Sequence, residues 1–314
     1  MEPDDREGVE WKQDVGMCEP LWTREPQADA IEKACRSTLA LSPEDGCAIS
    51  FLAEGGFNKV YAVQTAQGKF LMRVTLPVDP RHKTRGEVAT LAWVRRNTHV
   101  PVPKVLAFDD TSDNAIGFEW ILMQFMPGVS ANRLWRQLTT ATKTWIVEQV
   151  ADFQSQLFQR SFDDANFRSI GTLCTPELGG HNLGAQGKNQ GPAPGRVVSI
   201  AHFEGERVTY DIPRGPFRSS HDWLSAQLAA LREDHIKVLA TNPDEDKKED
   251  SEDILKFVER LSALLPKIFP ALQHPPECTV LCHNDLSLNN MLIDDDGKTR
   301  PSSTGSASLQ SRCG

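Results

Sequence analysis

Three polar residues late in the sequence, His283, Asp285 and Asn290, have the types and spacing that phosphoryl transfer requires. A carboxylate can accept the proton of an attacking hydroxyl, and an amide oxygen can help to hold Mg²⁺ against the phosphates. We therefore predict Asp285 and His283 as catalytic residues, with His283 bracing the loop, and Asn290 as a metal ligand. The alternative is an Asp- and Asn-rich turn between two strands.

Two apolar runs flank this loop, residues 278–282 before it and residues 291–293 after it. Each run has the length and composition of a short buried strand, and the turn at 294–297 ends the second one. The sequence thus predicts a polar loop held between two strands.

A glycine pair far upstream, Gly55 and Gly56, lies within a hairpin that we predict over residues 48–63. In a nucleotide-binding enzyme such a turn covers the phosphates, because glycine has no side chain to block them and the backbone N–H groups can face the anion. We predict Gly55, Gly56, Phe57 and Asn58 as nucleotide contacts. A plain hairpin is the alternative.

Two charged residues follow the hairpin. Arg73 lies on a predicted strand over residues 69–74, and Glu87 lies early in a predicted helix over residues 83–96. Glu87 is adjacent to the apolar stripe of that helix, so it could turn inward and pair with Arg73. An arginine on the solvent side of a strand and a solvent-facing, capping glutamate are the alternatives.

Two more strands are predicted, at residues 100–108 and 117–126, and Pro127 and Gly128 break the second one. The order is three strands, a helix and two strands. Beyond this point the pattern becomes helical, with predicted helices at 142–159, 224–231 and 254–265 and a short hairpin joining residues 197–201 to 207–210. The charged run at 244–250 predicts an exposed loop.

The spellings His-Asn-Asp-Leu at 283–286 and Gly-Gly-Phe-Asn-Lys-Val-Tyr at 55–61 resemble the aminoglycoside phosphotransferase and choline kinase-like family, in its fungal branch. The resemblance covers residues 46–297 and implies an α+β, protein kinase-like two-lobe fold, with a small antiparallel sheet lobe and a larger, mainly helical lobe. It implies ATP and Mg²⁺ as cofactors, phosphate binding by Arg73 where the family usually has Lys, and a cofactor-site pairing of Arg73 with Glu87.

The same resemblance implies a hinge at the end of the fifth strand, where backbone groups would meet the edge of adenine. Its residues would be Gln124, Phe125 and Met126, with Met123 lining the pocket. Ordinary core packing is the alternative for the two methionines. We expect an N-terminal extension at 1–45, the small lobe at 46–127, the helical lobe at 128–297 and a disordered tail at 298–314.

One part of the family pattern is absent. Kinase-like enzymes use a second metal ligand, an Asp on the strand after the catalytic hairpin, but residues 298–314 contain no Asp or Glu. We expect either a C-terminally truncated or mis-spliced product with impaired activity or a deliberately inactive relative. The two functional hypotheses are an ATP-dependent phosphotransferase acting on a small-molecule hydroxyl and a catalytically inactive module that binds a nucleotide or a protein.

The composition argues against several other classes of protein, namely nucleic-acid-binding, membrane-spanning and secreted proteins. The 314 residues carry a net charge of -9, which argues against nucleic-acid binding because phosphate contacts need clustered Lys and Arg. The seven cysteines are scattered without a Cys-x-x-Cys pair, and no apolar run is long enough to cross a membrane. With an acidic start unlike a signal peptide, these features predict a cytoplasmic protein. The oligomeric state cannot be read.

Overall fold

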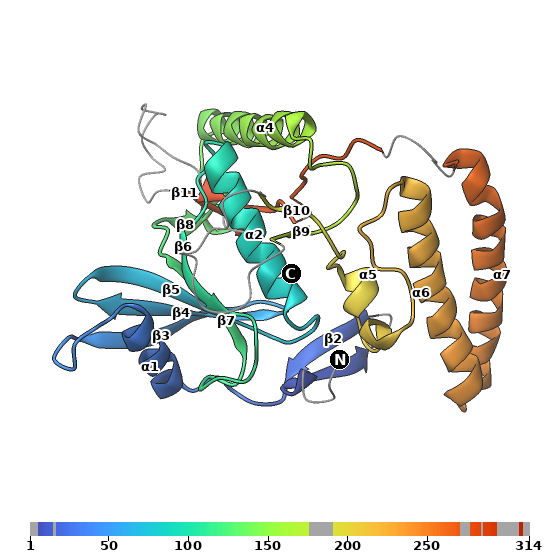
Figure 1. The fold of residues 1–314 in the computed structure, drawn as a ribbon, viewed down its shortest axis with the longest axis horizontal. Helices are drawn as coiled ribbons and strands as arrows, with labels where there is room; N and C mark the ends of the chain where they lie inside the picture. The colour runs from blue at the N-terminus through green and yellow to red at the C-terminus, as the bar shows by residue number, and fades with distance from the viewer. Residues whose placement is uncertain are drawn as a thin grey trace.

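A computed structural model describes residues 6–14, 17–175, 191–270, 277–283, 285–293 and 308–309. Its architecture is α+β, with a sheet lobe at one end and helices at the other (Figure 1). The main sheet has five antiparallel strands in the order β3-β4-β5-β7-β6. These strands are β3 (Cys47–Glu54), β4 (Asn58–Thr65), β5 (Gly68–Thr75), β6 (Val105–Asp109) and β7 (Glu119–Gln124).

The central strands β4, β5 and β7 are buried on both faces, and the strand register assigns each residue to one face. Val60 pairs with Arg73, and Leu71 pairs with Met123, so these side chains share one face, which we name the inner face. Tyr61, Met72 and Leu122 form the next row of partners and belong to the opposite, outer face.

The N-terminal segment covers the outer face. It forms a hairpin of β1 (Val9–Asp14) and β2 (Met17–Trp22), followed by α1 (Ala28–Thr38). In Figure 1, α1 lies below the sheet, on the side away from α2. Ile31 and Cys35 of α1 are fully buried in the same apolar cluster as Met72 and Leu122. The N-terminal segment therefore packs against the sheet.

The helix α2 (His82–Asn97) crosses the inner face and joins the two lobes. Val88 of α2 packs against Ile121 of the sheet. Further along the helix, Leu91 and Val94 join the apolar cluster of the second lobe. The predicted stripe of this helix is confirmed, and it carries Glu87 into the interior.

The start of α2 is held by a buried glutamate from β7. Glu119 Oε1 accepts the backbone N–H of Arg81 at 2.5 Å, and Oε2 accepts the hydroxyl of Thr84. Burial raises the pKa of Glu119 to about 7, although both hydrogen bonds oppose the rise by favouring the ionised form. The helix that carries Glu87 is therefore fixed to the sheet by a titratable group.

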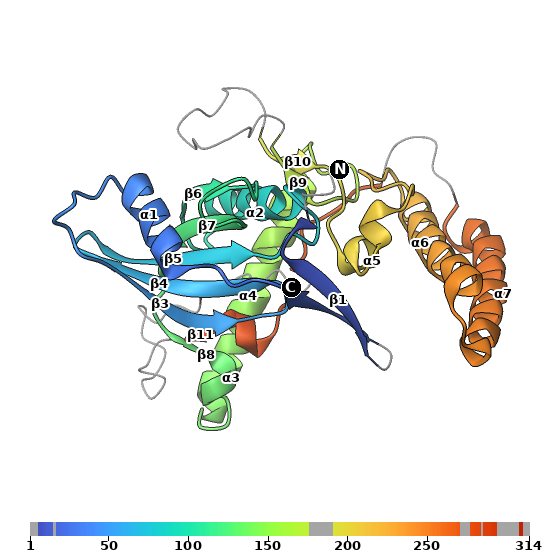
Figure 2. The ribbon, with the colours of Figure 1, turned by 90° about the horizontal axis from the view of Figure 1, so that it is seen from below.

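The second lobe contains the remaining helices and several short strands. Figure 2 shows α6 and α7 as a paired helical hairpin that extends away from the sheet. The elements are β8 (Val129–Ser130), α3 (Ala131–Leu134), α4 (Thr140–Asp163), β9 (Leu173–Cys174), β10 (Ala193–Pro194), α5 (Ile200–Phe203), α6 (Ser220–Thr241), α7 (Glu245–Ile268), β11 (Met291–Ile293) and β12 (Ser308–Leu309), with 3-10 turns at Arg207–Thr209 and Leu288–Asn290. None of the helices in the described ranges is long and apolar enough to span a membrane.

Two strand predictions were wrong. Residues 278–282 form no strand; instead Thr279 donates its hydroxyl to the carbonyl of Ser169, and the backbone N–H of Leu281 donates to Ser161 Oγ. The segment is thus attached to the end of α4 and the loop after it. The predicted hairpin at 197–201 and 207–210 is replaced by α5 and a 3-10 turn, whose carbonyl groups accept hydrogen bonds from the guanidinium of Arg214.

The charged run at 244–250 was also assigned wrongly, because it begins α7 rather than forming a loop. The side chain of Asp244 accepts the N–H of Asp246 and caps the helix. Glu245 and Asp246 lie in the first turn, where the helix dipole favours negative charge. The expected tail at 298–314 lies outside the described residues, apart from the β12 backbone that pairs with β11.

Candidate functional site

A cleft of about 450 Å³ separates the inner face of the sheet from the loop at 285–290. It contains the predicted glycine turn on one side and the predicted catalytic loop on the other, as expected for a site that touches one phosphate chain at both ends. The predicted residues that line it are Gly55, Gly56, Asn58, Arg73, Glu87, Met123, Phe125, Met126, Asp285 and Asn290.

Three other predicted site residues do not line this cleft. Gln124 lies one position beyond Met123 on β7, so its side chain is on the outer side, where its Oε1 accepts the N–H of Lys104. Phe57 is buried among aromatic rings on the outer face. His283 lies behind the loop, where its Nδ1 accepts the backbone N–H of Asp285 at 3.2 Å.

Asp285 and Asn290 are joined by direct hydrogen bonds. Asn290 Nδ2 donates to the carbonyl of Asp285 at 2.8 Å and to its carboxylate Oδ2 at 2.6 Å. Asn290 is 1% exposed, and within the described residues its Oδ1 is buried without a hydrogen-bond partner. A buried acceptor without a partner is costly, so this oxygen is suited to a ligand that the chain itself does not supply.

His283 acts on the loop as a neutral ring. Burial lowers the pKa of His283, and the nearby Asp285 opposes that effect only in part. A neutral ring can accept the Asp285 N–H through an unprotonated Nδ1. The structure therefore places His283 where it can support the loop without touching a bound group in the cleft.

Arg73 and Glu87 form an ion pair inside the cleft, as predicted. Arg73 Nη2 pairs with Glu87 Oε1, and the two side chains are 6% and 2% exposed. The solvent-facing alternatives for both residues are therefore wrong. Because α2 carries Glu87 and β5 carries Arg73, the pair ties the helix to the sheet at the edge of the cleft.

A buried lysine that the sequence analysis missed lies beside this pair. Lys83 is one helical turn before Glu87, on the same side of α2, and is 4% exposed. Its Nζ is 3.2 Å from Asn58 Oδ1, which also accepts the hydroxyl of Thr75 at 3.0 Å. The four-residue spacing to Glu87 is the signal that could have identified Lys83.

The glycines of the turn are not required by the chain's own geometry. Neither Gly55 nor Gly56 has a positive φ, and a Cβ added to Gly56 would meet no atom within 4 Å. The turn is closed by the N–H of Gly55, which donates to the carbonyl of Asn58 at 2.8 Å. The glycines therefore leave open space above the cleft, where a bound group could approach the backbone.

Apolar side chains above and below complete the cleft, and the sequence analysis did not single them out. Leu52, Val60 and Leu71 line it from the sheet, and Leu292 of β11 lines it from the second lobe. The alternation of β4 and β5 would have assigned Val60 and Leu71 to the face of Arg73. Flat apolar walls of this kind suit a planar ring.

The predicted hinge and the predicted catalytic loop are connected through a short strand pair. β8 follows the hinge and pairs with β11, with Leu292 opposite Ser130. Ser130 also donates its hydroxyl to the carbonyl of Leu288 at 3.2 Å. Gly128, at φ +121°, allows this approach, because a Cβ there would lie 2.8 Å from the carbonyl oxygen of Ile293. Phe125 and Met126 are thereby fixed relative to Asn290.

The residues present fit a nucleotide with a magnesium ion, although the chain supplies few charged ligands. Among the residues that the structure describes, no group of three His, Cys, Asp or Glu side chains could hold a metal by itself. Asn290 Oδ1 would hold the ion together with phosphate oxygens, which supply much of the coordination of Mg²⁺ in nucleotide sites.

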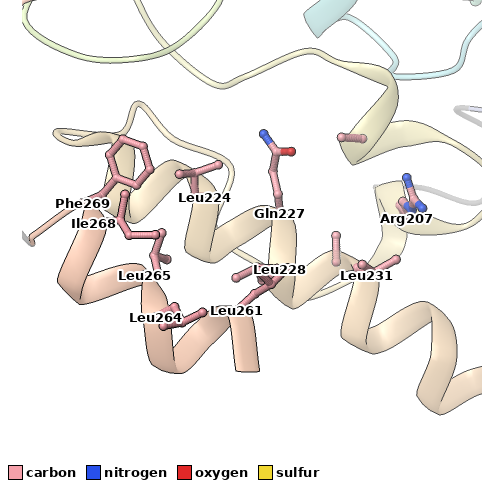
Figure 3. Close-up of a pocket in the computed structure, with 12 residues that line it drawn as sticks. Arg207, Leu224, Gln227, Leu228, Leu231, Leu261, Leu264, Leu265, Ile268 and Phe269 are labelled. Carbon is pink, nitrogen blue, oxygen red and sulfur yellow. The ribbon is translucent and has the colours of Figure 1, made fainter. Parts of the chain in front are cut away.

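A second cavity, of about 430 Å³, lies between α6 and α7 (Figure 3). Leucines dominate its lining, and Arg207 is the charged residue at its edge. It shares no lining residue with the cleft that contains Asp285. An apolar hollow of this kind offers a phosphate chain no set of donors, so the cleft is the candidate active site.

Residues 48–300 match the family model described as the phosphotransferase enzyme family. The match covers most of the chain, so the chain belongs to that family, and its fold is the α+β, kinase-like fold of two lobes.

Two of the curated relatives are fungal proteins. A subtelomeric hrmA-associated cluster protein of Aspergillus fumigatus is 36% identical over 180 residues, which are 55% of this chain and 33% of that protein. Altered inheritance of mitochondria protein 9 of Saccharomyces cerevisiae is 28% identical over 120 residues, which are 35% of this chain and 19% of that protein. The chain thus aligns with a third or less of the length of these relatives.

Among solved structures, aminoglycoside phosphotransferase APH(4)-Ia is similar to this chain, with 16% sequence identity and a TM-score of 0.46. The alignment covers 86% of this chain and 68% of the APH(4)-Ia chain. The GDP and kanamycin complex of APH(2")-IIIa is 12% identical, with a TM-score of 0.41, and covers 89% of this chain and 70% of its own.

Proposed function

We propose that this chain is an ATP-dependent phosphotransferase that acts on a hydroxyl group of a small molecule. The observation that carries the proposal is Asn290 Oδ1, which is buried and has no hydrogen-bond partner among the residues that the structure describes. The amide nitrogen of the same side chain donates to Asp285, in a cleft that faces the glycine turn. This is the arrangement that places a proton acceptor and a metal ligand at one phosphate chain. Family membership supports the reaction class.

In the proposed reaction, Asp285 orients the substrate hydroxyl and accepts its proton as the hydroxyl oxygen bonds to the γ-phosphorus of ATP. The bond from that phosphorus to the β,γ-bridging oxygen breaks, and ADP leaves. Asn290 keeps the carboxylate of Asp285 in position, because its Nδ2 donates a hydrogen bond to Asp285 Oδ2 at 2.6 Å. His283 supports the loop from behind. A bound Mg²⁺ would neutralise charge on the phosphate oxygens, and Asn290 Oδ1 would be among its ligands.

At the other end of the cleft, the absence of side chains at Gly55 and Gly56 would let the phosphates approach the backbone, where the N–H of Gly56 would donate to them. Arg73 would add a positive charge that Glu87 orients. Val60 and Leu292 would enclose the adenine ring. The backbone of Phe125 and Met126, directly after the last paired residue of β7, would meet its polar edge.

We further propose a small-molecule substrate and a cytoplasmic setting. The cysteines within the described residues are all free, which agrees with a reducing compartment.

A catalytically inactive nucleotide- or protein-binding module is the second candidate. It is favoured by the sequence after the predicted catalytic hairpin, because residues 298–314 contain no Asp or Glu that could serve as the second metal ligand. The nearest acids, Asp294, Asp295 and Asp296, belong to the predicted turn and lie outside the described residues. Without this second, acidic metal ligand, phosphoryl transfer would be impaired. The amide of Asn290 is neutral and is therefore a weak ligand for a hard dication.

The test is transfer of the γ-phosphoryl group from Mg-ATP to a panel of small hydroxyl and amino compounds. Asp285→Asn should lower turnover by about 10²–10⁴-fold, since it removes the general base. Asn289→Ala is the matched control, because Asn289 lines the same cleft and has no proposed role. Turnover that is equal in wild type and Asp285→Asn would refute the assignment. Mg-ATP binding without turnover would support the second candidate.

A further inference from the structure

Phe57 lies between two cleft residues, yet its own side chain points the other way. Gly56 and Asn58 line the cleft, whereas Phe57 is 7% exposed within the outer-face cluster. Its ring lies edge-on to Phe203, with centroids 5.4 Å apart and an interplanar angle of 88°. Trp11 completes the surroundings at 6.5 Å. We name Trp11 and Phe203 the aromatic socket of Phe57.

The backbone transmits this anchoring to the turn. The carbonyl of Phe57 accepts the N–H of Leu76 at 2.9 Å, and the N–H of Gly55 donates to the carbonyl of Asn58 at 2.8 Å. Gly56 therefore has a fixed residue on one side and a closed turn on the other. Movement of the Phe57 ring would therefore move the backbone of Gly56, which lines the cleft.

An ion pair between a buried lysine and an exposed glutamate fixes β4, the arm of the hairpin that follows Phe57. Lys59 is 4% exposed, and its Nζ lies 2.5 Å from both carboxylate oxygens of Glu25, in the segment between β2 and α1. The ring centroid of Trp22 is 4.8 Å away. The N-terminal segment thus holds the turn at two places.

The socket also reaches the second lobe. Phe203 is the last residue of α5, which Figure 2 shows between β1 and α6. After α5, Arg207 bonds Asp234 of α6 at 2.7 Å, and Tyr210 donates its hydroxyl to the same carboxylate at 2.8 Å. The contact of Phe57 with Phe203 therefore connects the glycine turn to the α6–α7 hairpin.

We propose that Phe57 is a positioning residue for the nucleotide: its aromatic socket holds the Gly55–Gly56 turn in its binding geometry before the phosphates arrive. The inference rests on the proposed nucleotide site. A glycine turn loses much conformational freedom when it is ordered, and ordering it in advance lowers that cost on binding. The socket would therefore keep the turn ready to bind the phosphates before they arrive.

The experiment measures Mg-ATP affinity by titration calorimetry in wild type, Phe57→Leu, Trp11→Leu and Ile31→Ala. Ile31 is a matched stability control, because it is fully buried in the same cluster but belongs to α1. We expect Phe57→Leu and Trp11→Leu each to bind Mg-ATP about tenfold more weakly than the wild type, equivalent to about 1.4 kcal/mol. Ile31→Ala should lower the melting temperature and leave the affinity unchanged.

Each outcome decides a separate point. Unchanged affinity in a folded Phe57→Leu protein, or an equal loss in Ile31→Ala, would overturn the positioning role. If Phe57→Leu does not fold, Trp11→Leu decides alone, because Trp11 is only partly buried and belongs to the N-terminal hairpin. Failure of the wild type to bind Mg-ATP would instead refute the proposed nucleotide site itself.

Discussion

Replacing Glu87 by Ala should destabilise the fold more than most single substitutions would. The change removes the carboxylate that faces Arg73, and both partners are nearly inaccessible to water. Breaking a buried pair from one side costs about 3–5 kcal/mol, because the remaining charge stays in the interior. For a chain of this kind that corresponds to a fall in melting temperature of roughly 6–20 °C.

The double variant Arg73→Leu/Glu87→Leu separates the stability effect from the functional one. Exchanging a whole buried pair for apolar residues is often neutral for stability, so the double variant should be more stable than Glu87→Ala by about 2 kcal/mol or more. It should nevertheless lose Mg-ATP affinity, since Arg73 is the proposed phosphate contact. Denaturant unfolding and calorimetric titration measure the two quantities independently.

The exposed pair of Asp253 and Lys256 provides the control for this cycle. Its side chains are 73% and 64% exposed, so Asp253→Ala should leave the unfolding midpoint unchanged. If Glu87→Ala is as stable as that control, the Arg73–Glu87 pair does not tie α2 to the sheet. If the double variant keeps full Mg-ATP affinity, Arg73 has no phosphate role.

Three further predictions follow from individual contacts. Gly56→Ala should keep or slightly raise the melting temperature, since its Cβ meets no protein atom, but weaken Mg-ATP binding about tenfold. Glu119 has a folded pKa of about 7, above its ordinary 4.5, so its contribution to stability is complete below pH 4.5 and is lost as pH rises to about 7. Unfolding curves should therefore show the wild type losing up to about 3 kcal/mol relative to Glu119→Gln over that range, and a constant difference would contradict the assignment. Ser161→Ala removes the buried hydroxyl that accepts the N–H of Leu281, and should cost about 1–3 kcal/mol in the same assay.

The sequence predicted best where local pattern and burial agree. The strands around Gly55, the helix that carries Glu87 and the pairing of Glu87 with Arg73 all follow from periodicity and the cost of burying a lone charge. The prediction for residues 244–250 was wrong because the local pattern there is ambiguous. A charged run is compatible with both a loop and the first turn of a helix, and only the cap at Asp244 distinguishes them.

Other features depend on contacts between distant segments and could not be read from sequence. Phe57 was predicted next to a nucleotide because its neighbours are glycines, but Trp11 and Phe203 place its ring on the other face. Strand composition at 278–282 was overridden because Ser161 and Ser169 satisfy that segment's donors. Sequence spacing alone specifies neither partner.

The most direct test of a magnesium-nucleotide site in this cleft is the effect of Mg²⁺ on ATP affinity, measured by titration calorimetry with and without the ion in wild type, Asn290→Ala and Asn289→Ala. We predict that Mg²⁺ strengthens ATP binding in the wild type and in Asn289→Ala. Asn290→Ala should lose this gain, because it removes the buried oxygen that we propose as a ligand of the ion. A wild type whose ATP affinity does not respond to Mg²⁺, or a folded Asn290→Ala protein that responds fully, would contradict the account.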